Sequence, residues 1–266
     1  MLATDPDADR VGIAVRCKDG SYELLTGNEV GALLLDYICA GRIENGTMPQ
    51  RPVAVKSIVS TPLADAVAKH YGVEMRSVLT GFKWIGDQIA RLEQAGEVQR
   101  FIFGFEESYG YLAGPYVRDK DAIVSSMLFC EMAAYYRSVG SSLRERLDEI
   151  YASYGRYLNK TDSFEFPGLS GMDKMASIMQ TLRTAPPAQI AGYRVTEFTD
   201  YEQPEKTGLP ASNVLRFALE GGASVIVRPS GTEPKIKLYF TTLGKDLAQA
   251  EAQKEALAAA IESVLA

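Results

Sequence analysis

The chain has 266 residues, of which 46% are hydrophobic, so it is long enough for about two domains with buried cores. Its formal net charge of −6 argues against nucleic acid as the main partner, although a local basic cluster can still bind an anionic small molecule. No apolar run reaches membrane-spanning length, the start of the chain lacks a secretory signal, and the three cysteines form no C-x-x-C pair, so we expect a cytoplasmic protein with reduced thiols and no membrane partner.

Three aspartates alternate near the start of the chain, at Asp5, Asp7 and Asp9, and Arg10 follows them. In an extended or looped backbone, alternate side chains project to one side, and converging carboxylates repel one another unless a cation lies between them. Carboxylate oxygens suit a hard divalent cation, with Mg²⁺ expected where a phosphate is also bound, and Arg10 has donors shaped for a phosphate. A solvated acidic turn is the alternative. An EF-hand loop is excluded, because Arg10 and Arg16 stand where that loop needs Gly and Glu.

The next elements are a hairpin and a helix. Residues 11–15 are predicted to form a strand that an Asp-Gly turn joins to residues 22–25. A helix is expected over residues 27–40, with Gly41 as its stop. A strand should lead into the aspartate loop, yet only residues 1–3 precede it, so the chain is predicted to begin inside a domain.

Strands and helices alternate between residues 52 and 140. The expected strands cover residues 53–59, 73–79 and 101–105, and the expected helices cover residues 61–71, 83–95 and 121–139. This alternation predicts a parallel sheet with right-handed crossovers, in which ligands gather at the carboxyl ends of the strands. Polar loops follow all three strands, at residues 60–61, 80–83 and 106–108, the last opening a long loop to residue 120. A pocket at that edge is therefore the default hypothesis.

The pattern changes towards the carboxyl end. Residues 141–167 are predicted to connect two domains, with a helix at 143–154 and an extended linker at 164–167. Beyond them lie a helix at 172–184, strands around 192–196, 214–219, 223–228 and 235–240, and an Ala-rich helix at 246–265. The expected fold class is thus α/β: a three-layer parallel-type α/β domain, then an α+β domain with an antiparallel sheet and flanking helices.

A second candidate site lies between the last two strands, in the run Arg-Pro-Ser-Gly-Thr-Glu-Pro-Lys over residues 228–235. A glycine between two hydroxyl residues can present backbone N–H groups as an anion nest. Ser230 and Thr232 add hydroxyl donors, and Arg228 adds a bidentate fork. The run is not a Walker loop, which needs G-x-x-x-x-G-K. A plain hairpin turn is the alternative.

Four stretches stand in a fixed order: TDPDADR, TGFKWIG, GFEESYGY followed by RDKDA, and RPSGTEPKIKLY. Together they resemble the α-D-phosphohexomutase family of phosphoglucomutases and phosphomannomutases, over essentially the whole chain. GFKWIG and GFEESYGY resemble most the phosphoglucomutase/phosphopentomutase branch. The resemblance implies a four-domain enzyme that moves a phosphoryl group between the C1 and C6 oxygens of a hexose phosphate. It would do so through a hexose bisphosphate, with an active-site phosphoserine and Mg²⁺.

The family's phosphoserine loop, a Ser followed by His-Asn-Pro, has no match in this sequence. The resemblance therefore implies a C-terminal fragment of a longer enzyme, inactive alone, whose missing partners are the N-terminal domains. Residues 1–27 would be the remnant of domain 2 with the metal loop. Residues 28–160 would be domain 3 with the sugar-binding loops, and residues 161–266 would be domain 4 with the phosphate-binding loop.

The resemblance also implies roles for individual residues. The Mg²⁺ ligands would be Asp5, Asp7 and Asp9. The catalytic side chains would be Arg10 and Lys120. The sugar-binding residues would be Thr80, Gly81, Lys83, Glu106 and Ser108. The residues that hold the phosphate that is not reacting would be Arg228, Ser230, Gly231 and Thr232.

Other functions compete with this one. The chain could be a sugar-phosphate-binding module without turnover, or the parent enzyme could prefer a pentose or mannose phosphate. A phosphatase of the haloacid dehalogenase class also begins with an apolar strand and D-x-D. It is disfavoured, because that strand is missing and Arg10 follows where Thr or Val is expected.

Overall fold

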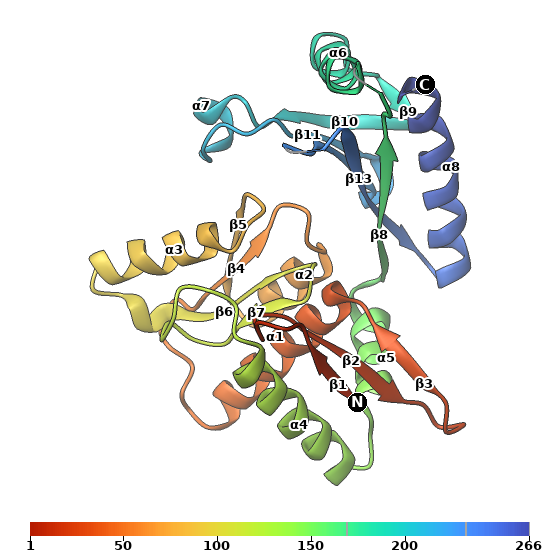
Figure 1. Cartoon of the computed structure of the whole chain (residues 1–266). Coiled ribbons are helices and arrows are strands. Elements are labelled where there is room, and N and C mark those ends of the chain that lie inside the picture. Colours follow the sequence, from red (N-terminus) through yellow and green to blue (C-terminus); the bar gives the residue numbers. More distant parts are fainter. Residues whose placement is uncertain (169, 232, 266) are drawn as a thin grey trace. The chain divides into compact units, whose positions relative to one another are not determined.

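A computed structural model describes residues 1–168, 170–231 and 233–265. The chain folds into two compact units, Met1–Tyr154 and Gly155–Ala266, which are treated separately below (Figure 1). A bilayer-spanning helix is not found in the described part of the chain, because none combines sufficient length with sufficient apolar character.

The first unit opens with a small antiparallel sheet in the order β1-β2-β3. Its strands are β1 (Leu2–Thr4), β2 (Val11–Arg16) and β3 (Tyr22–Leu25). The predicted hairpin is confirmed. The leading strand exists as well, because Leu2 pairs with Ile13 and Thr4 with Val11, although three residues are too few for a sequence pattern.

A four-stranded sheet forms the centre of this unit, in the order β5-β4-β6-β7. The strands are β4 (Val53–Ser57), β5 (Glu74–Val78), β6 (Phe101–Glu106) and β7 (Gly110–Leu112). The first three are parallel, as expected, whereas β7 runs antiparallel to β6 at the edge. The prediction of an uninterrupted loop over residues 106–120 is therefore wrong. Strand β7 was missed because three residues are too few to show an alternating pattern.

Helices cover both faces of the sheet. They are α1 (Gly27–Glu44), α2 (Leu63–His70), α3 (Lys83–Gln94), α4 (Ala122–Ser138) and α5 (Leu143–Tyr154), with a 3₁₀ turn η1 (Val98–Arg100). Consecutive strand residues point to opposite faces. A Cβ on Gly104 would meet Ile85 of α3, whereas Phe105 packs on Gly31 of α1, so α1 and α3 lie on opposite faces. This arrangement is the predicted three-layer architecture.

Helix α1 runs past its predicted stop at Gly41. It begins with a capping box between Thr26 and Glu29, and it ends at Glu44, where the Asn45 side chain donates to the Gly41 carbonyl at 2.8 Å. A glycine costs a helix only about 1 kcal/mol, so the side-chain cap at Asn45 decides where this helix ends.

The second unit is a six-stranded antiparallel sheet in the order β8-β13-β12-β11-β10-β9. Its strands are β8 (Arg156–Glu165), β9 (Gln189–Ile190), β10 (Tyr193–Asp200), β11 (Leu215–Leu219), β12 (Ser224–Pro229) and β13 (Lys235–Gly244). Its helices are α6 (Gly171–Thr184), α7 (Pro204–Thr207), α8 (Leu247–Leu265) and the 3₁₀ turn η2 (Glu220–Gly222). Side chains of α6 and α8 share one hydrophobic core with the sheet, as expected for an α+β domain.

The prediction that residues 141–167 only connect two domains is wrong. Residues 156–165 form β8, which pairs along its whole length with β13. All ten of its residues are half-buried or exposed, as expected of an edge strand, so its sequence carries little hydrophobic signal. The boundary expected after residue 160 falls inside this strand.

Candidate functional site

The loop between β1 and β2 carries the three aspartates. One carboxylate oxygen from each of Asp5, Asp7 and Asp9 lies within 4.8 Å of the other two. Hydrogen bonds inside the loop hold this shape: the Asp5 N–H donates to the Arg10 carbonyl at 3.2 Å, and the Arg10 N–H donates to Asp5 Oδ1 at 3.0 Å. The hydrogen bond from Arg10 is the main reason why the pKa of Asp5 lies below its ordinary value. The loop therefore presents an ionised carboxylate beside two others.

Asp9 has two different oxygens. Its Oδ2 lies 2.8 Å from the Lys120 ammonium. Its Oδ1 is buried and has no hydrogen-bond partner among the residues that the structure describes; Arg10 Nε is 4.0 Å away. A buried oxygen without a donor is costly and calls for an explanation. An all-oxygen set with one unsatisfied buried oxygen fits a hard divalent cation such as Mg²⁺.

Lys120 reaches this loop from the segment after β7. Its ammonium lies 2.8 Å from Asp9 Oδ2 and 2.8 Å from Asp119 Oδ1, and its side chain is only 9% exposed. Burial opposes the charge on Lys120, but the hydrogen bonds to Asp119 and Asp9 outweigh it and raise the pKa of Lys120. The side chain therefore carries a fixed positive charge beside the aspartates.

The sugar-loop candidates lie at the carboxyl ends of β5 and β6. Glu106 ends β6 and is buried, and its Oε1 accepts the Gly81 N–H at 2.6 Å. Gly81 has φ = 111°, a conformation that side chains disfavour. The structure thus joins Gly81 to Glu106. Thr80 and Ser108 are half-buried in the same two loops.

Lys83 and the loop after β4 are not part of the hydrogen bond between Gly81 and Glu106. Lys83 is exposed, with its ammonium 5.0 Å from the Trp84 ring centroid. Ser60 and Thr61 are buried, Ser60 Oγ lies 2.8 Å from Ser57 Oγ, and the Thr61 N–H donates to Asn28. Ser60 and Thr61 are therefore buried and hydrogen-bonded within the first unit.

Strand β7 links the aspartate loop to the sugar loop. Gly110 pairs with Glu106 on one side and forms an isolated bridge with Arg10 on the other. The Val11 N–H donates to the Tyr109 carbonyl at 3.2 Å. The β6–β7 ladder and this bridge therefore place Arg10 and Glu106 on either side of Gly110. Sequence reasoning missed this connection together with β7.

The phosphate-loop candidate belongs to the second unit, where it joins β12 to β13. The Ser230 N–H donates to the Lys235 carbonyl at 2.8 Å, and Ser230 Oγ accepts the Glu233 N–H at 3.3 Å. Arg228 is half-buried and makes a long hydrogen bond of 3.5 Å to Tyr239. Gly231 is exposed, with open space where a Cβ would stand. Thr232 lies outside the described residues.

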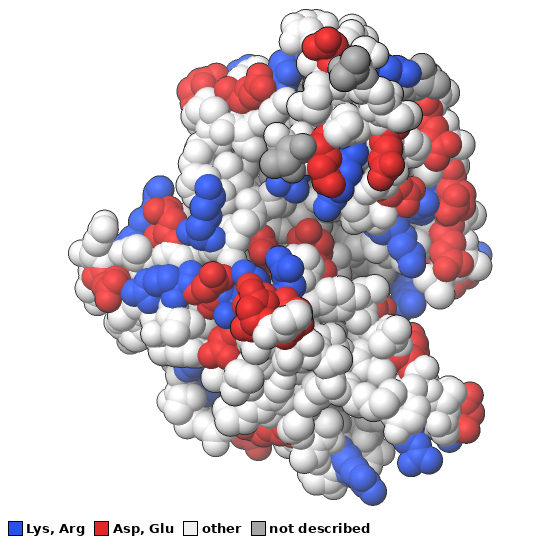
Figure 2. All heavy atoms as spheres, viewed as in Figure 1, with Lys and Arg blue, Asp and Glu red and all other residues white. Residues whose placement is uncertain are grey.

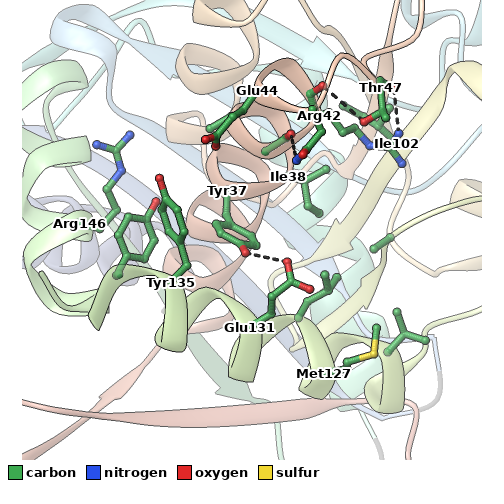
Figure 3. A pocket seen from close by; sticks show the side chains of 17 residues that line it. Tyr37, Ile38, Arg42, Glu44, Thr47, Ile102, Met127, Glu131, Tyr135 and Arg146 are labelled. Carbon is green, nitrogen blue, oxygen red and sulfur yellow. Dashed lines mark hydrogen bonds between the residues drawn. The ribbon is translucent and has the colours of Figure 1, made fainter. Parts of the chain in front are cut away.

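Lysines and arginines are interspersed with acidic side chains on the surface that Figure 2 shows. A cavity of about 800 Å³ lies away from the candidates above, between α1 and α4. In Figure 3 Tyr37 of α1 and Glu131 of α4 meet there, with the tyrosine hydroxyl donating at 2.7 Å. Among the described residues, those predicted for the site do not line this cavity.

Two family models match the chain. Residues 26–154 match the phosphoglucomutase/phosphomannomutase alpha/beta/alpha domain III, and residues 177–260 match the phosphoglucomutase/phosphomannomutase C-terminal domain. The chain belongs to the phosphoglucomutase/phosphomannomutase family. The resemblance inferred from the four sequence motifs is thereby confirmed.

Curated relatives of this family member include phosphoglucomutases from Staphylococcus aureus strains MSSA476 and USA300. They are 41% and 40% identical to it over 251 residues, which are 91% of this chain and 44% of each relative. The chain thus spans less than half the length of these relatives.

Solved structures share the fold of this family member. An open form of pp63/parafusin, a phosphoglucomutase from Paramecium, is 23% identical with a TM-score of 0.70, over 99% of this chain and 44% of that one. A phosphomannomutase from Thermus thermophilus is 22% identical with a TM-score of 0.63, over 99% and 45%. N-acetylphosphoglucosamine mutase from Aspergillus fumigatus, in complex with GlcNAc-6P and magnesium, is 15% identical with a TM-score of 0.55, over 100% and 49%.

Proposed function

We propose that this chain is the metal-, sugar- and phosphate-binding part of a phosphoglucomutase. The whole enzyme would interconvert hexose 1-phosphate and hexose 6-phosphate through a hexose bisphosphate. One observation supports the proposal: Gly110 pairs with Glu106 in the β6–β7 ladder and with Arg10 through an isolated bridge, so the aspartate loop and the sugar loop flank the same residue. The name phosphoglucomutase, carried by relatives 40–41% identical, supports the choice of substrate.

Each group has a distinct part in this proposal. Asp5, Asp7 and Asp9 would hold Mg²⁺, which supplies positive charge for a phosphoryl group when it is bound. The magnesium complex of the Aspergillus fumigatus relative supports this assignment. Arg10 and Lys120 would add fixed positive charge on the transferring phosphate, because phosphoryl transfer depends mainly on positioning and charge neutralisation.

The remaining candidates would position the substrate. Glu106 and Ser108 would bind the sugar hydroxyls, with Thr80, Gly81 and Lys83 lining the same loop. In the second unit, Arg228, Ser230, Gly231 and Thr232 would bind a phosphate group. By domains, residues 1–27 would end the family's domain 2, the rest of the first unit would be domain 3, and the second unit, which begins at Gly155 and includes β8, would be domain 4.

A second function is favoured for the chain by itself: binding of sugar phosphates without turnover. Its 266 residues contain no Ser-His-Asn-Pro stretch to carry the phosphoryl group. The chain alone should therefore bind glucose 1,6-bisphosphate but show no mutase activity above background. A coupled assay measures the conversion of glucose 1-phosphate to glucose 6-phosphate, with Staphylococcus aureus phosphoglucomutase as the positive control. Robust conversion by the purified chain would contradict this expectation.

Mutase activity can be tested by joining this chain to the upstream part of a related enzyme. We would fuse the part of the Staphylococcus aureus enzyme that precedes the match to this chain, and assay the chimera with glucose, mannose and ribose phosphates. Turnover that Asp9→Asn abolishes is the expected result. A folded chimera that binds hexose bisphosphate but turns over none of the three would argue against the mutase. A preference for mannose or ribose phosphate would move the specificity within the family.

Glu106 offers a test of sugar recognition in the chain alone. Glu106→Gln keeps an oxygen for the Gly81 N–H but turns one acceptor into a donor, so the ratio of glucose 1-phosphate to mannose 1-phosphate affinity should change. Glu106→Ala also leaves the Gly81 N–H without its partner, which should lower the free energy of unfolding by about 1–3 kcal/mol. Calorimetry with both sugar phosphates measures the ratio, and inorganic phosphate is the control ligand, with unchanged affinity. An unaltered ratio in both variants would exclude Glu106 from sugar recognition.

A further inference from the structure

One lysine is shared by two carboxylates beside the aspartate loop. The Lys120 ammonium lies 2.8 Å from Asp9 Oδ2 and 2.8 Å from Asp119 Oδ1. The two partners differ in their surroundings, because the Asp9 side chain is 27% exposed and the Asp119 side chain is 70% exposed. Asp119 lies in the RDKDA stretch, but no role was predicted for it from the sequence.

The stem of Lys120 has little freedom. A Cβ on Gly110 would lie 2.3 Å from Lys120 Cδ, so the side chain runs directly over the one residue that leaves room for it. The ammonium lies 5.3 Å from the centroid of the Phe82 ring, and the Lys120 N–H donates to Asp119 Oδ1 at 2.8 Å. The bond from the Lys120 backbone N–H orients the Asp119 carboxylate, whereas Gly110 and Phe82 confine the Lys120 side chain itself, so its charge stays near the two carboxylates.

Lys120 and a divalent cation would therefore compete for the Asp9 carboxylate. In the structure it pairs with Lys120 through Oδ2, while its buried Oδ1 has no hydrogen-bond partner among the described residues. A divalent cation bound by Asp9 would repel an ammonium held on the same carboxylate, since the two like charges would be only a few ångströms apart. Binding of the cation is easier if another acceptor can hold the ammonium.

We propose that Asp119 is a positioning residue that holds Lys120 when Asp9 takes up a divalent cation. Without Asp119, Lys120 would be left to Asp9 alone and would compete with the cation for it. The proposal rests on the metal site of the proposed function. It concerns how tightly that site binds, and it adds no ligand to the site.

The affinity for Mg²⁺ then depends on Asp119 only through Lys120. Asp119→Asn should weaken Mg²⁺ binding by about two- to five-fold, the range expected for losing a partly exposed charged partner. Lys120→Met should tighten it, because the competing ammonium is gone. In the Lys120→Met background, Asp119→Asn should have almost no further effect. A charge acting only through space would instead weaken binding by the same factor in both backgrounds.

The experiment is a double-mutant cycle on the full chain, with Mg²⁺ titrated by calorimetry and by the NMR shifts of the Ala8 and Arg10 amides. Asp148→Asn changes the net charge equally at an exposed carboxylate paired with Arg144, and should leave the affinity unchanged. Asp119→Glu restores a carboxylate and should restore most of the affinity.

Each outcome decides something. A loss in Asp119→Asn that disappears in the Lys120→Met background supports the proposal. Equal losses in both backgrounds overturn the role of Asp119 and leave the metal site intact. No Mg²⁺ binding by the unaltered chain overturns the metal site and this inference with it. Thermal unfolding of each variant shows whether a changed affinity reflects misfolding.

Discussion

Replacing Asp36 by alanine is expected to lower the free energy of unfolding of the first unit by about 3 kcal/mol. Asp36 is 1% exposed, and it accepts hydrogen bonds from Arg146 Nε and Nη2, both at 2.9 Å, and from the Tyr71 hydroxyl at 3.0 Å. The variant leaves the guanidinium without the partner that most raises its pKa. Arg146 keeps its ion pair with Glu149, and its side chain stays partly exposed to solvent. We therefore expect a loss at the low end of the range measured when one partner of a buried ion pair is removed.

Asp148→Ala is the matched control, because it removes an exposed carboxylate from the same unit, and its partner Arg144 keeps a second ion pair with Glu23. Its cost should stay within about 1 kcal/mol. The only tryptophan, Trp84, lies in α3 of the first unit, so its fluorescence in urea follows that unit. Equal losses in the two variants would mean that the Asp36 pair does not hold α1 against α5.

Arg228→Ala is expected to weaken the binding of sugar phosphates by about ten-fold or more. A charge-assisted contact to a phosphate is worth about 1.5–3 kcal/mol, and 1.4 kcal/mol corresponds to a factor of ten. The loss should be the same for glucose and mannose phosphates, because both carry the same phosphate. Calorimetry with the two sugar phosphates gives both values.

Arg216→Ala serves as the control for Arg228. It removes one positive charge from the same sheet, at β11, where Arg216 pairs with Glu197. It should change phosphate affinity by less than about two-fold, since an exposed ion pair on the sheet contributes little to a remote ligand. A strong change in the glucose-to-mannose ratio in Arg228→Ala would show that this residue reads the sugar, contrary to its assigned role.

The sequence predicted elements wherever a hydrophobic pattern was long enough. Strands β4, β5 and β6 and the helices that follow them lie within a few residues of their predicted places. Strands β7 and β8 were missed for opposite reasons. The first has only three residues. The second is a polar edge strand whose hydrogen-bond partners in β13 lie at least 70 residues later in the chain.

The candidate site shows the same limit. Alternation along the chain was enough to predict that Asp5, Asp7 and Asp9 converge. The hydrogen bond from Gly81 to Glu106 joins residues 25 positions apart, and no local pattern signals it. The ion pair of Lys120 with Asp9 spans a still longer stretch of chain, so the partners of Lys120 could only come from the folded structure.

An NMR titration of the ¹⁵N-labelled chain with glucose 1,6-bisphosphate in the presence of Mg²⁺ tests these site assignments most directly. We expect the amide resonances of Ala8, Arg10, Gly81, Ser230 and Gly231 to shift. The amide resonances of residues around the cavity between α1 and α4 should not shift. Saturable shifts confined to that cavity, or none at the three loops, would contradict the claim that these loops form the sugar-phosphate and metal sites of the chain.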